Sequence, residues 1–452
     1  MLKWLIVVKI FPFQGILYNK DKLKDLSRVF TPPYDVISPQ EQDRFYELHD
    51  FNYIRLILGK EFPGDSEYNN RYVRAAAFLE GWLRHKILVK EEKPALYLYE
   101  QRFKVGTKSF SRVGFIGILR LEDMGRGKVY PHEATHSQAK IDRLQLMRAT
   151  FSNLECIFSL YNDEENKVLK LLKPFMKRKP YIDVTDKDKV KHRLWKVDKA
   201  AVITKIVKEM KDKAVFIADG HHRYEAAVRF KNELKFKNTK FSEDEPYNHI
   251  MMYFTSMEDP GLVILPIHRV IRGLNYFDPV RFEADLAQFF EVAAYKASKI
   301  TGDRVRKQLL RDMEKKGKEK HCFGLYLGHQ RYFLLTLKDE NIMEEMTEEE
   351  KPPAWKRLDT NILQYVVLER ILAIVQQLAE KVVYVKDDAE AVQLVDEKDG
   401  QAAFFLNPTK IADVIAIASK LEKMPQKSTF FYPKLLSGLT LNKINHGEKI
   451  KL

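Results

Sequence analysis

The chain has 452 residues, of which 45% are hydrophobic and 31% charged, with only 19 glycines and 18 prolines. This composition excludes a disordered, fibrous or collagen-like protein, and the length suits about two to four domains of ~100–200 residues each. The 77 Lys and Arg residues outnumber the 63 Asp and Glu residues, a formal charge of +14. This excess suits nucleic acid, phosphorylated metabolites or a membrane surface, without choosing among them.

The cysteines and the N-terminus indicate in which cellular compartment we expect the protein. Cys156 and Cys322 lie far apart in apolar runs, which excludes a disulfide framework and a zinc site built on thiolates. The apolar run 4–8 is closed by Lys9 and is too short for a signal-peptide core or a membrane span of about 20 residues. We therefore expect a cytoplasmic protein without a membrane segment.

Helical and strand-like patterns alternate along the chain without internal repeats, which predicts a mixed α/β (α+β) fold. In chain order, we expect helices at 68–85, 132–149, 199–212, 222–234 and 360–380, the last capped by Thr360. We expect strands at 95–103, 111–121, 156–161, 214–218, 248–257 and 261–271, the first two paired around a turn, and a Lys-rich loop at 231–244. A boundary near 274–279 divides the chain into an N-terminal α/β region, 1–275, and a C-terminal α/β region, 276–452.

The sharpest local motif is the strand, turn and helix of AVFIADGHHRYEAA at 214–227. A helix that begins directly after a buried strand presents free N–H groups and a positive dipole end to an anion. Asp219 can accept a proton, orient a histidine or hold Mg²⁺, and His221 is a second catalytic candidate. The alternative is that Asp219 only caps the helix while the histidines pack or face water. The residues expected to bind phosphate here are Gly220, His222 and Arg223.

The sequence PHEATH at 131–136 contains the H-E-x-x-H pattern of zinc peptidases, in which two histidines on a helix bind the metal. Pro131 places this pattern in the first helical turn rather than in mid-helix. On the expected helix, Lys140 and Arg143 share a face with His132 and His136, and these cations would repel zinc. The same four side chains suit a phosphate.

In that second interpretation, Glu133 is a catalytic base or a metal ligand, since a serine hydroxyl needs a base to attack a phosphoryl group. The open alternative is an amphipathic helix whose polar residues pair with neighbours. The phosphate-binding candidates of this segment are His132, Thr135, Lys140 and Arg143.

The loop MPQKSTFFYPK at 424–434 is a further candidate, because two prolines bracket a cluster of donors that is followed by three aromatic residues. Lys427, Ser428 and Thr429 could clamp a phosphate while an aromatic ring stacks on an adenine. The alternative is a rigid surface loop with aromatic packing. Walker and Rossmann glycine motifs are absent from the sequence.

The strand–DGHHR–helix motif resembles the phosphate-binding motif of the ParB/sulfiredoxin-like superfamily, which includes sulfiredoxins, chromosome-partitioning proteins and free serine kinases. The whole chain is similar to one large uncharacterised prokaryotic family. The matching blocks are TPPYDVIS (31–38), the HEAT segment, IADGHHRYEAA, LPIHRV (265–270) and MPQKSTFFYPK. The resemblance implies a ParB/sulfiredoxin-like core with an additional C-terminal α/β domain. Genes of that family often lie beside those of the phosphorylated serine pathway, which implies serine or phosphoserine as substrate.

These observations favour an enzyme of phosphoryl transfer on a small phosphorylated metabolite, with the kinase and phosphatase directions left open. Mg²⁺, held by Asp219, and ATP or ADP as phosphate donor are expected if a nucleotide takes part. The first alternative is a nucleotide- or nucleic-acid-binding protein, although the sequence carries no helix-turn-helix or zinc-finger signature. The second alternative is a zinc-dependent hydrolase through the HEATH segment.

Overall fold

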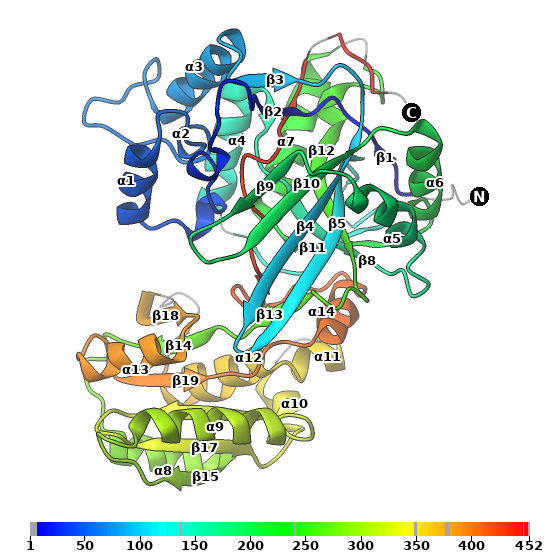
Figure 1. Cartoon of the computed structure of the whole chain (residues 1–452). Helices are drawn as coiled ribbons and strands as arrows, with labels where there is room; N and C mark the ends of the chain where they lie inside the picture. Colours follow the sequence, from blue (N-terminus) through cyan, green and yellow to red (C-terminus); the bar gives the residue numbers. More distant parts are fainter. Residues whose placement is uncertain are drawn as a thin grey trace. The chain divides into compact units, whose positions relative to one another are not determined.

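The computed structural model describes residues 7–123, 125–135, 137–238, 241–347, 350–375, 380–445 and 447–450. The chain forms two compact units (Figure 1). Unit 1 comprises residues 1–131, 135–263 and 433–452, and unit 2 comprises residues 132–134 and 264–432. The last part of the chain therefore returns to the first unit. The division of the chain at 275 stays a prediction about separate domains.

Unit 1 is built on a sheet that has nine strands among the described residues, in the order β6-β11-β8-β12-β5-β4-β10-β9, with β1 paired to β5. The expected antiparallel hairpin is confirmed as β4 and β5. Most pairs are antiparallel, but β6–β11 and β8–β12 are parallel. The strands are β1 (Ile10–Phe11), β4 (Leu96–Val105), β5 (Lys108–Arg120), β6 (Val129–Pro131), β8 (Ile157–Tyr161), β9 (Ile182–Thr185), β10 (Lys191–Val197), β11 (Val215–Asp219) and β12 (His249–Ser256).

Helices of unit 1 pack their apolar faces on this sheet and on each other, and α4 packs against α7. Two short strand pairs lie outside the main sheet, β2 with β3 and β7 with β21. The elements are α1 (Pro39–Leu48), α2 (Ile54–Ile57), α3 (Arg71–Arg84), α4 (Ser137–Thr150), α5 (Lys167–Leu172), α6 (Ala200–Met210), α7 (His221–Lys237), β2 (Ile16–Tyr18), β3 (Leu88–Lys90), β7 (Ser152–Asn153) and β21 (Asn442–Lys443).

Unit 2 has an antiparallel sheet whose described strands follow the order β15-β17-β16-β19-β14-β18, and the shorter strands β13 and β20 pair separately. Apolar residues of the helices and of this sheet form its core. The strands are β13 (Val263–Leu265), β14 (His268–Ile271), β15 (Phe290–Tyr295), β16 (Cys322–Tyr326), β17 (Tyr332–Leu337), β18 (Val382–Val385), β19 (Ala402–Phe405) and β20 (Phe430–Tyr432). The helices are α8 (Pro279–Phe289), α9 (Gly302–Lys316), α10 (Ile342–Met346), α11 (Pro353–Lys356), α12 (Asp359–Ile362), the π-helix η5 (Leu363–Ile371), α13 (Asp388–Asp396) and α14 (Ile411–Ala418).

Three expectations about helix ends were wrong. The helix expected from residue 132 begins at Ser137, because Glu133 pairs as a β-bridge with Met424 and keeps the segment before the helix extended. Thr360 lies inside α12, whose N-cap is Leu358. Helix α7 continues to Lys237, into the expected loop. No helix of the described residues is long and apolar enough to cross a membrane.

The buried imidazole of His249, at the start of β12, makes the stability of unit 1 sensitive to acid. It is 2% exposed, and its Nδ1 lies 3.0 Å from the carbonyl oxygen of Glu245, so this nitrogen donates. Burial lowers the pKa of His249 to about 4. Between pH 6.5 and 4 the unfolded chain binds a proton that the folded chain does not, so the free energy of unfolding falls as the pH drops.

We expect His249 to account for a loss on the order of 3 kcal/mol across this pH range. Urea unfolding at pH 7.5, 6, 5 and 4 measures it. The variant His249→Gln keeps a donor and does not titrate, so its stability should fall less steeply over the same range. Equal slopes for the two proteins would contradict the prediction.

Candidate functional site

Asp219, the last residue of β11, is the centre of a buried charged cluster in unit 1. Its Oδ2 accepts a hydrogen bond from Nη2 of Arg223 at 2.8 Å, and its Oδ1 is paired with Nζ of Lys434. The side chains of these three residues are only 10–16% exposed. Lys434 belongs to the C-terminal segment of unit 1, drawn in red in Figure 1. We call these three residues the Asp219 cluster. Together their side chains carry one excess positive charge.

The turn that builds this cluster needs a glycine. The strand pairing of β11 with β8 shifts register between Ile217 and Asp219, and Gly220 then takes a φ of +94° before α7 begins at His221. A Cβ atom on Gly220 would lie 3.0 Å from Nε and Nη2 of Arg223. The left-handed backbone and the close guanidinium both favour a residue without a side chain.

Replacing Gly220 by Ala is expected to lower the free energy of unfolding by more than the ~1 kcal/mol that a left-handed alanine costs by itself. The Arg223 guanidinium must also move away from the new Cβ. Gly64 is a matched control, because its φ is +90° but a Cβ there would meet nothing within 4 Å. Urea unfolding of Gly220→Ala and Gly64→Ala separates the two effects. Equal losses would contradict a steric role for the guanidinium.

The N-terminus of α7 is positively charged. Its N-cap, Gly220, has no side chain to accept from the first N–H groups, and its first turn carries no acidic residue. Instead that turn holds His221, His222 and Arg223. Arg223 is 8% exposed, and its Nε has no hydrogen-bond partner although it is buried. Because Nε lies beside Gly220, an unused donor faces a helix end that already attracts anions.

The charges of this cluster determine what Asp219 can do. Burial alone would raise the pKa of Asp219, but Lys434 and Arg223 hold that pKa well below its ordinary value. Burial works against the charge of Arg223, yet Glu155 and Asp219 raise its pKa above the ordinary value. Both groups are therefore ionised at neutral pH, and Asp219 is too weak a base to take a proton from a hydroxyl.

Further charged side chains lie around the cavity that Arg223 also lines. Arg143 on α4 is 5% exposed and pairs with Asp142, while its Nη1 lies 3.5 Å from Oε2 of Glu155. The guanidinium of Arg143 also lies 3.8 Å from the ring centroid of Tyr34. Oε1 of Glu155 accepts from Oγ of Ser437 at 3.0 Å. Arg143, expected to bind phosphate, is thus engaged in internal contacts.

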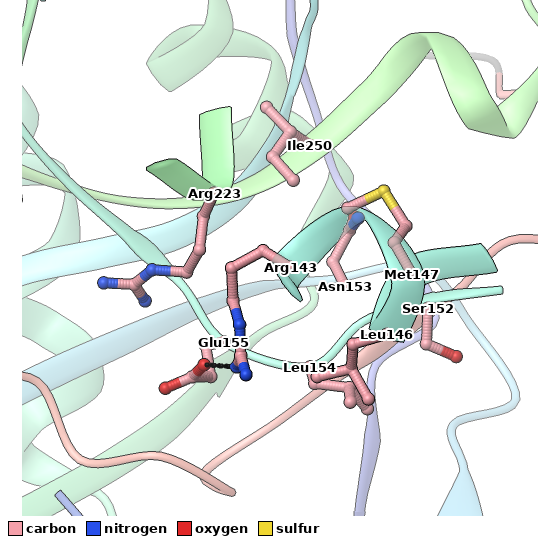
Figure 2. A pocket seen from close by; sticks show the side chains of 9 residues that line it. All are labelled: Arg143, Leu146, Met147, Ser152, Asn153, Leu154, Glu155, Arg223 and Ile250. Carbon is pink, nitrogen blue, oxygen red and sulfur yellow. Dashed lines mark hydrogen bonds and ion pairs between the residues drawn. The ribbon is translucent and has the colours of Figure 1, made fainter. Parts of the chain in front are cut away.

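A cavity of about 30 Å³ adjoins these side chains (Figure 2). It is large enough for about one or two water molecules but not for a metabolite. Figure 2 shows the Arg143 side chain directed toward Glu155, with Arg223 among the other lining residues. The lining residues are Arg143, Leu146, Met147, Ser152, Asn153, Leu154, Glu155, Arg223 and Ile250.

Two other predicted phosphate ligands, Thr135 and Lys140, both contact Glu225 of α7. Oγ1 of Thr135 donates to Oε2 of Glu225 at 2.9 Å, and Nζ of Lys140 lies 3.0 Å from the same oxygen. The side chain of Lys140 is 33% exposed. These two residues tie α4 and the segment before it to α7. Their role as phosphate ligands stays a prediction.

The remaining candidates form a separate group in unit 2. Nε2 of His132 lies 3.1 Å from Oγ1 of Thr429, and Oε1 of Glu133 accepts from the backbone N–H of Lys427 at 2.8 Å. Oγ of Ser428 donates to the carbonyl oxygen of Pro425 at 2.7 Å. Ser428 and Thr429 are buried, whereas Lys427 is exposed. The hydroxyl groups therefore support the loop.

The described part of the H-E-x-x-H pattern does not lie on a helix, as the zinc interpretation requires. His132 and Glu133 precede the first residue of α4, and His136 lies outside the described residues. Among the described residues, no group of three or more His, Cys, Asp or Glu side chains is placed to hold a metal ion. Both oxygens of Asp219 already face cations, so this carboxylate does not fit the Mg²⁺ site that the sequence suggested.

Sequence reasoning missed Lys434, although it is the last residue of the MPQKSTFFYPK block. The pattern of donors in the same block indicated Lys427, Ser428 and Thr429 instead. The signal was the second proline, Pro433, which sets Lys434 apart from the loop before it. Which carboxylate Lys434 would meet could not be read, because Asp219 lies 215 positions earlier.

The chain belongs to the family described as protein of unknown function (DUF1015), whose model matches residues 10–361. Among solved structures, it is similar to a conserved hypothetical protein from Pyrococcus furiosus, with 14% identity, a TM-score of 0.30 and coverage of 68% of this chain and 90% of that one. A free serine kinase in complex with AMP matches at 10% identity and a TM-score of 0.31, covering 67% and 83%. SbnI with a C-terminal truncation, from Staphylococcus aureus, matches at 9% identity and a TM-score of 0.31, covering 69% and 82%. No curated protein matches.

Proposed function

We propose that this protein transfers a phosphoryl group to or from a small metabolite, with serine or phosphoserine as the substrate pair, at the N-terminus of α7. The observation that carries the proposal is the unused Nε donor of Arg223, buried beside Gly220. A buried donor without a partner costs about 1–3 kcal/mol, and an anionic oxygen at this position would remove that cost.

Each residue of the site has a distinct role in this proposal. The N–H groups of the first turn and the guanidinium of Arg223 bind the phosphoryl oxygens, as helix N-termini and arginine forks do. Asp219 stays ionised and fixes the orientation of Arg223. His221, the first residue of α7 and 6% exposed, is the candidate for proton transfer in place of Asp219.

Nucleotide and metal enter this proposal together. ATP or ADP would donate the phosphoryl group in the kinase direction, and the phosphates themselves would supply ligands to a Mg²⁺ ion. Mg²⁺ ligands supplied by the phosphates suit a site in which Asp219 is already paired with Arg223 and Lys434. The catalytic steps assigned to the protein need only binding, orientation and proton transfer.

Phosphorus NMR of the purified full chain tests the function. The protein is incubated with Mg²⁺ and serine plus ATP or ADP, and separately with phosphoserine alone or with AMP or ADP. We expect the phosphoserine signal to appear or disappear in at least one mixture. The variant Arg229→Met, which changes a 62%-exposed arginine of the same helix, should behave like the wild type. Absence of turnover in every mixture would refute the serine assignment.

A further inference from the structure

The segment that carries Lys434 is held on unit 1 by its backbone. The carbonyl oxygen of Pro433 accepts from Nη2 of Arg112 at 2.5 Å, and that of Lys434 accepts from Nε2 of Gln101 at 2.9 Å. Further along, Ser437 and Thr31 bond through both backbone groups, at 2.8 and 3.4 Å. These contacts leave the segment 433–437 little freedom. The side chain of Lys434 is thereby directed to Asp219.

Arg112 is a fully buried cation among the residues that hold this segment. It lies on β5, it is 0% exposed, and burial lowers the pKa of its guanidinium. It sits opposite Gln101 in the β4–β5 hairpin and donates to the Gln101 side chain. Its guanidinium also lies 4.5 Å from the ring centroid of Phe158. Burying a cation costs several kcal/mol unless it is well bonded. The hydrogen bonds of Arg112 to Gln101 and to the carbonyl group of Pro433 offset part of that cost.

We propose that Lys434 is a phosphate-binding residue of the α7 site and that Arg112 is the positioning residue that holds it there, an inference that rests on the proposed function. Arg112 and Gln101 fix the two carbonyl groups on either side of the Lys434 Cα atom. A lysine side chain loses up to about 2 kcal/mol of rotamer freedom when it is ordered. Holding its backbone and pairing its ammonium group with Asp219 in advance lowers the conformational entropy that remains to be lost when an anion binds.

The contact with Asp219 places the ammonium group of Lys434 close to the start of α7. Oδ1 of Asp219 pairs with Nζ of Lys434, and Asp219 directly precedes Gly220, the N-cap of that helix. The depressed pKa of Asp219 keeps this carboxylate charged at neutral pH, so that it attracts the ammonium group of Lys434. Arg223 supplies a rigid fork, and Lys434 supplies a point charge that can follow the phosphoryl group.

The test measures the binding of inorganic phosphate and of ADP to the full chain by titration calorimetry. We expect Lys434→Met to weaken binding roughly 10- to 100-fold, because it removes charged hydrogen bonds, and Lys434→Arg to weaken it less. Arg112→Met should also weaken binding, although Arg112 itself does not contact the phosphate in this proposal. Lys205→Met, which changes an exposed lysine of α6, is the matched control and should bind as the wild type does.

A double-variant cycle separates positioning from simple destabilisation. If Arg112 acts through Lys434, the variant with both changes binds phosphate no more weakly than Lys434→Met alone. Losses that multiply would overturn the positioning role. If Arg112→Met fails to fold, Gln101→Glu replaces it, since a carboxylate still accepts from Arg112 but cannot donate to the Lys434 carbonyl group.

The outcomes distinguish this inference from the function itself. Wild-type binding of Lys434→Met, with binding lost in Arg223→Met, overturns the role of Lys434 and leaves the phosphate site in place. Absence of phosphate and ADP binding by the wild type, together with absence of turnover, overturns both the function and this inference. Weaker binding in Lys434→Met and in the positioning variant, with no further loss in the double variant, supports the inference.

Discussion

Asp219→Asn is expected to lower the free energy of unfolding by about 3–5 kcal/mol at pH 7, because it leaves two buried cations facing a neutral amide. Arg223 and Lys434 are both directed at this carboxylate, and the side chains of all three are at most 16% exposed. The amide has one acceptor oxygen, so one of the two cations would also meet an N–H₂ donor. Urea unfolding at pH 7 measures the loss.

The control for this prediction lies on α7, the helix that carries Arg223. Glu233→Gln removes a carboxylate that is 30% exposed and pairs with Arg148 at 2.6 Å, and it should cost less than about 1 kcal/mol. A loss of similar size in both variants would show that burial of the Asp219 cluster does not increase its contribution to the free energy of unfolding.

The pH dependence of the same variant follows from the depressed pKa of Asp219. A carboxyl group whose folded pKa is lowered contributes stability above its unfolded pKa near 3.9, and that stability is lost as the pH falls below this value. The difference between the wild type and Asp219→Asn should therefore be constant from pH 7 to about pH 5 and shrink below pH 4. A difference that grows toward low pH would contradict this assignment.

A second large effect is expected for Arg223→Met, which should weaken phosphate binding by about 100-fold or more. The guanidinium is buried, and it holds both the unused Nε donor and the Nη2 contact to Asp219. A charged, buried hydrogen bond to an anion is worth about 2–5 kcal/mol when one partner is removed. Titration calorimetry with inorganic phosphate measures the change.

Arg223→Lys separates charge from geometry, since it keeps the cation but has no Nε donor. We expect an intermediate affinity for this variant, because lysine binds phosphate as a point charge and not as a fork. Arg229→Met is the control, because this arginine lies on the same helix with its side chain 62% exposed. Unchanged affinity in Arg223→Met would remove the basis for a phosphate site at α7.

Local patterns were sufficient for the strand, turn and helix around Asp219. Apolar residues from Val215 to Ala218 predict a buried strand, and Gly220 after Asp219 predicts a turn. The structure confirms β11 and α7 on either side of that glycine. Such elements depend on neighbours a few positions apart, which the sequence displays directly.

The local pattern was misleading where an isolated β-bridge to a distant residue replaced the expected first turn of a helix. Residues 132–136 have a helical spacing of histidines, but Glu133 pairs with Met424, nearly 300 positions away, and α4 starts only at Ser137. Ser428 and Thr429, which a local pattern also suggested, are buried in loop contacts, and their role as phosphate ligands stays a prediction. A backbone hydrogen bond to a distant segment leaves no mark in the local spacing of residues.

The sequence by itself determined the mixed α/β class, the family and the motif that ends β11 and begins α7. Only the tertiary structure decided which charges meet there. Lys434 reaches Asp219 because Arg112 and Gln101, paired across a hairpin, fix the backbone on either side of it. Those contacts depend on how the sheet and the returning C-terminal segment pack together. They therefore become visible only when the chain is folded.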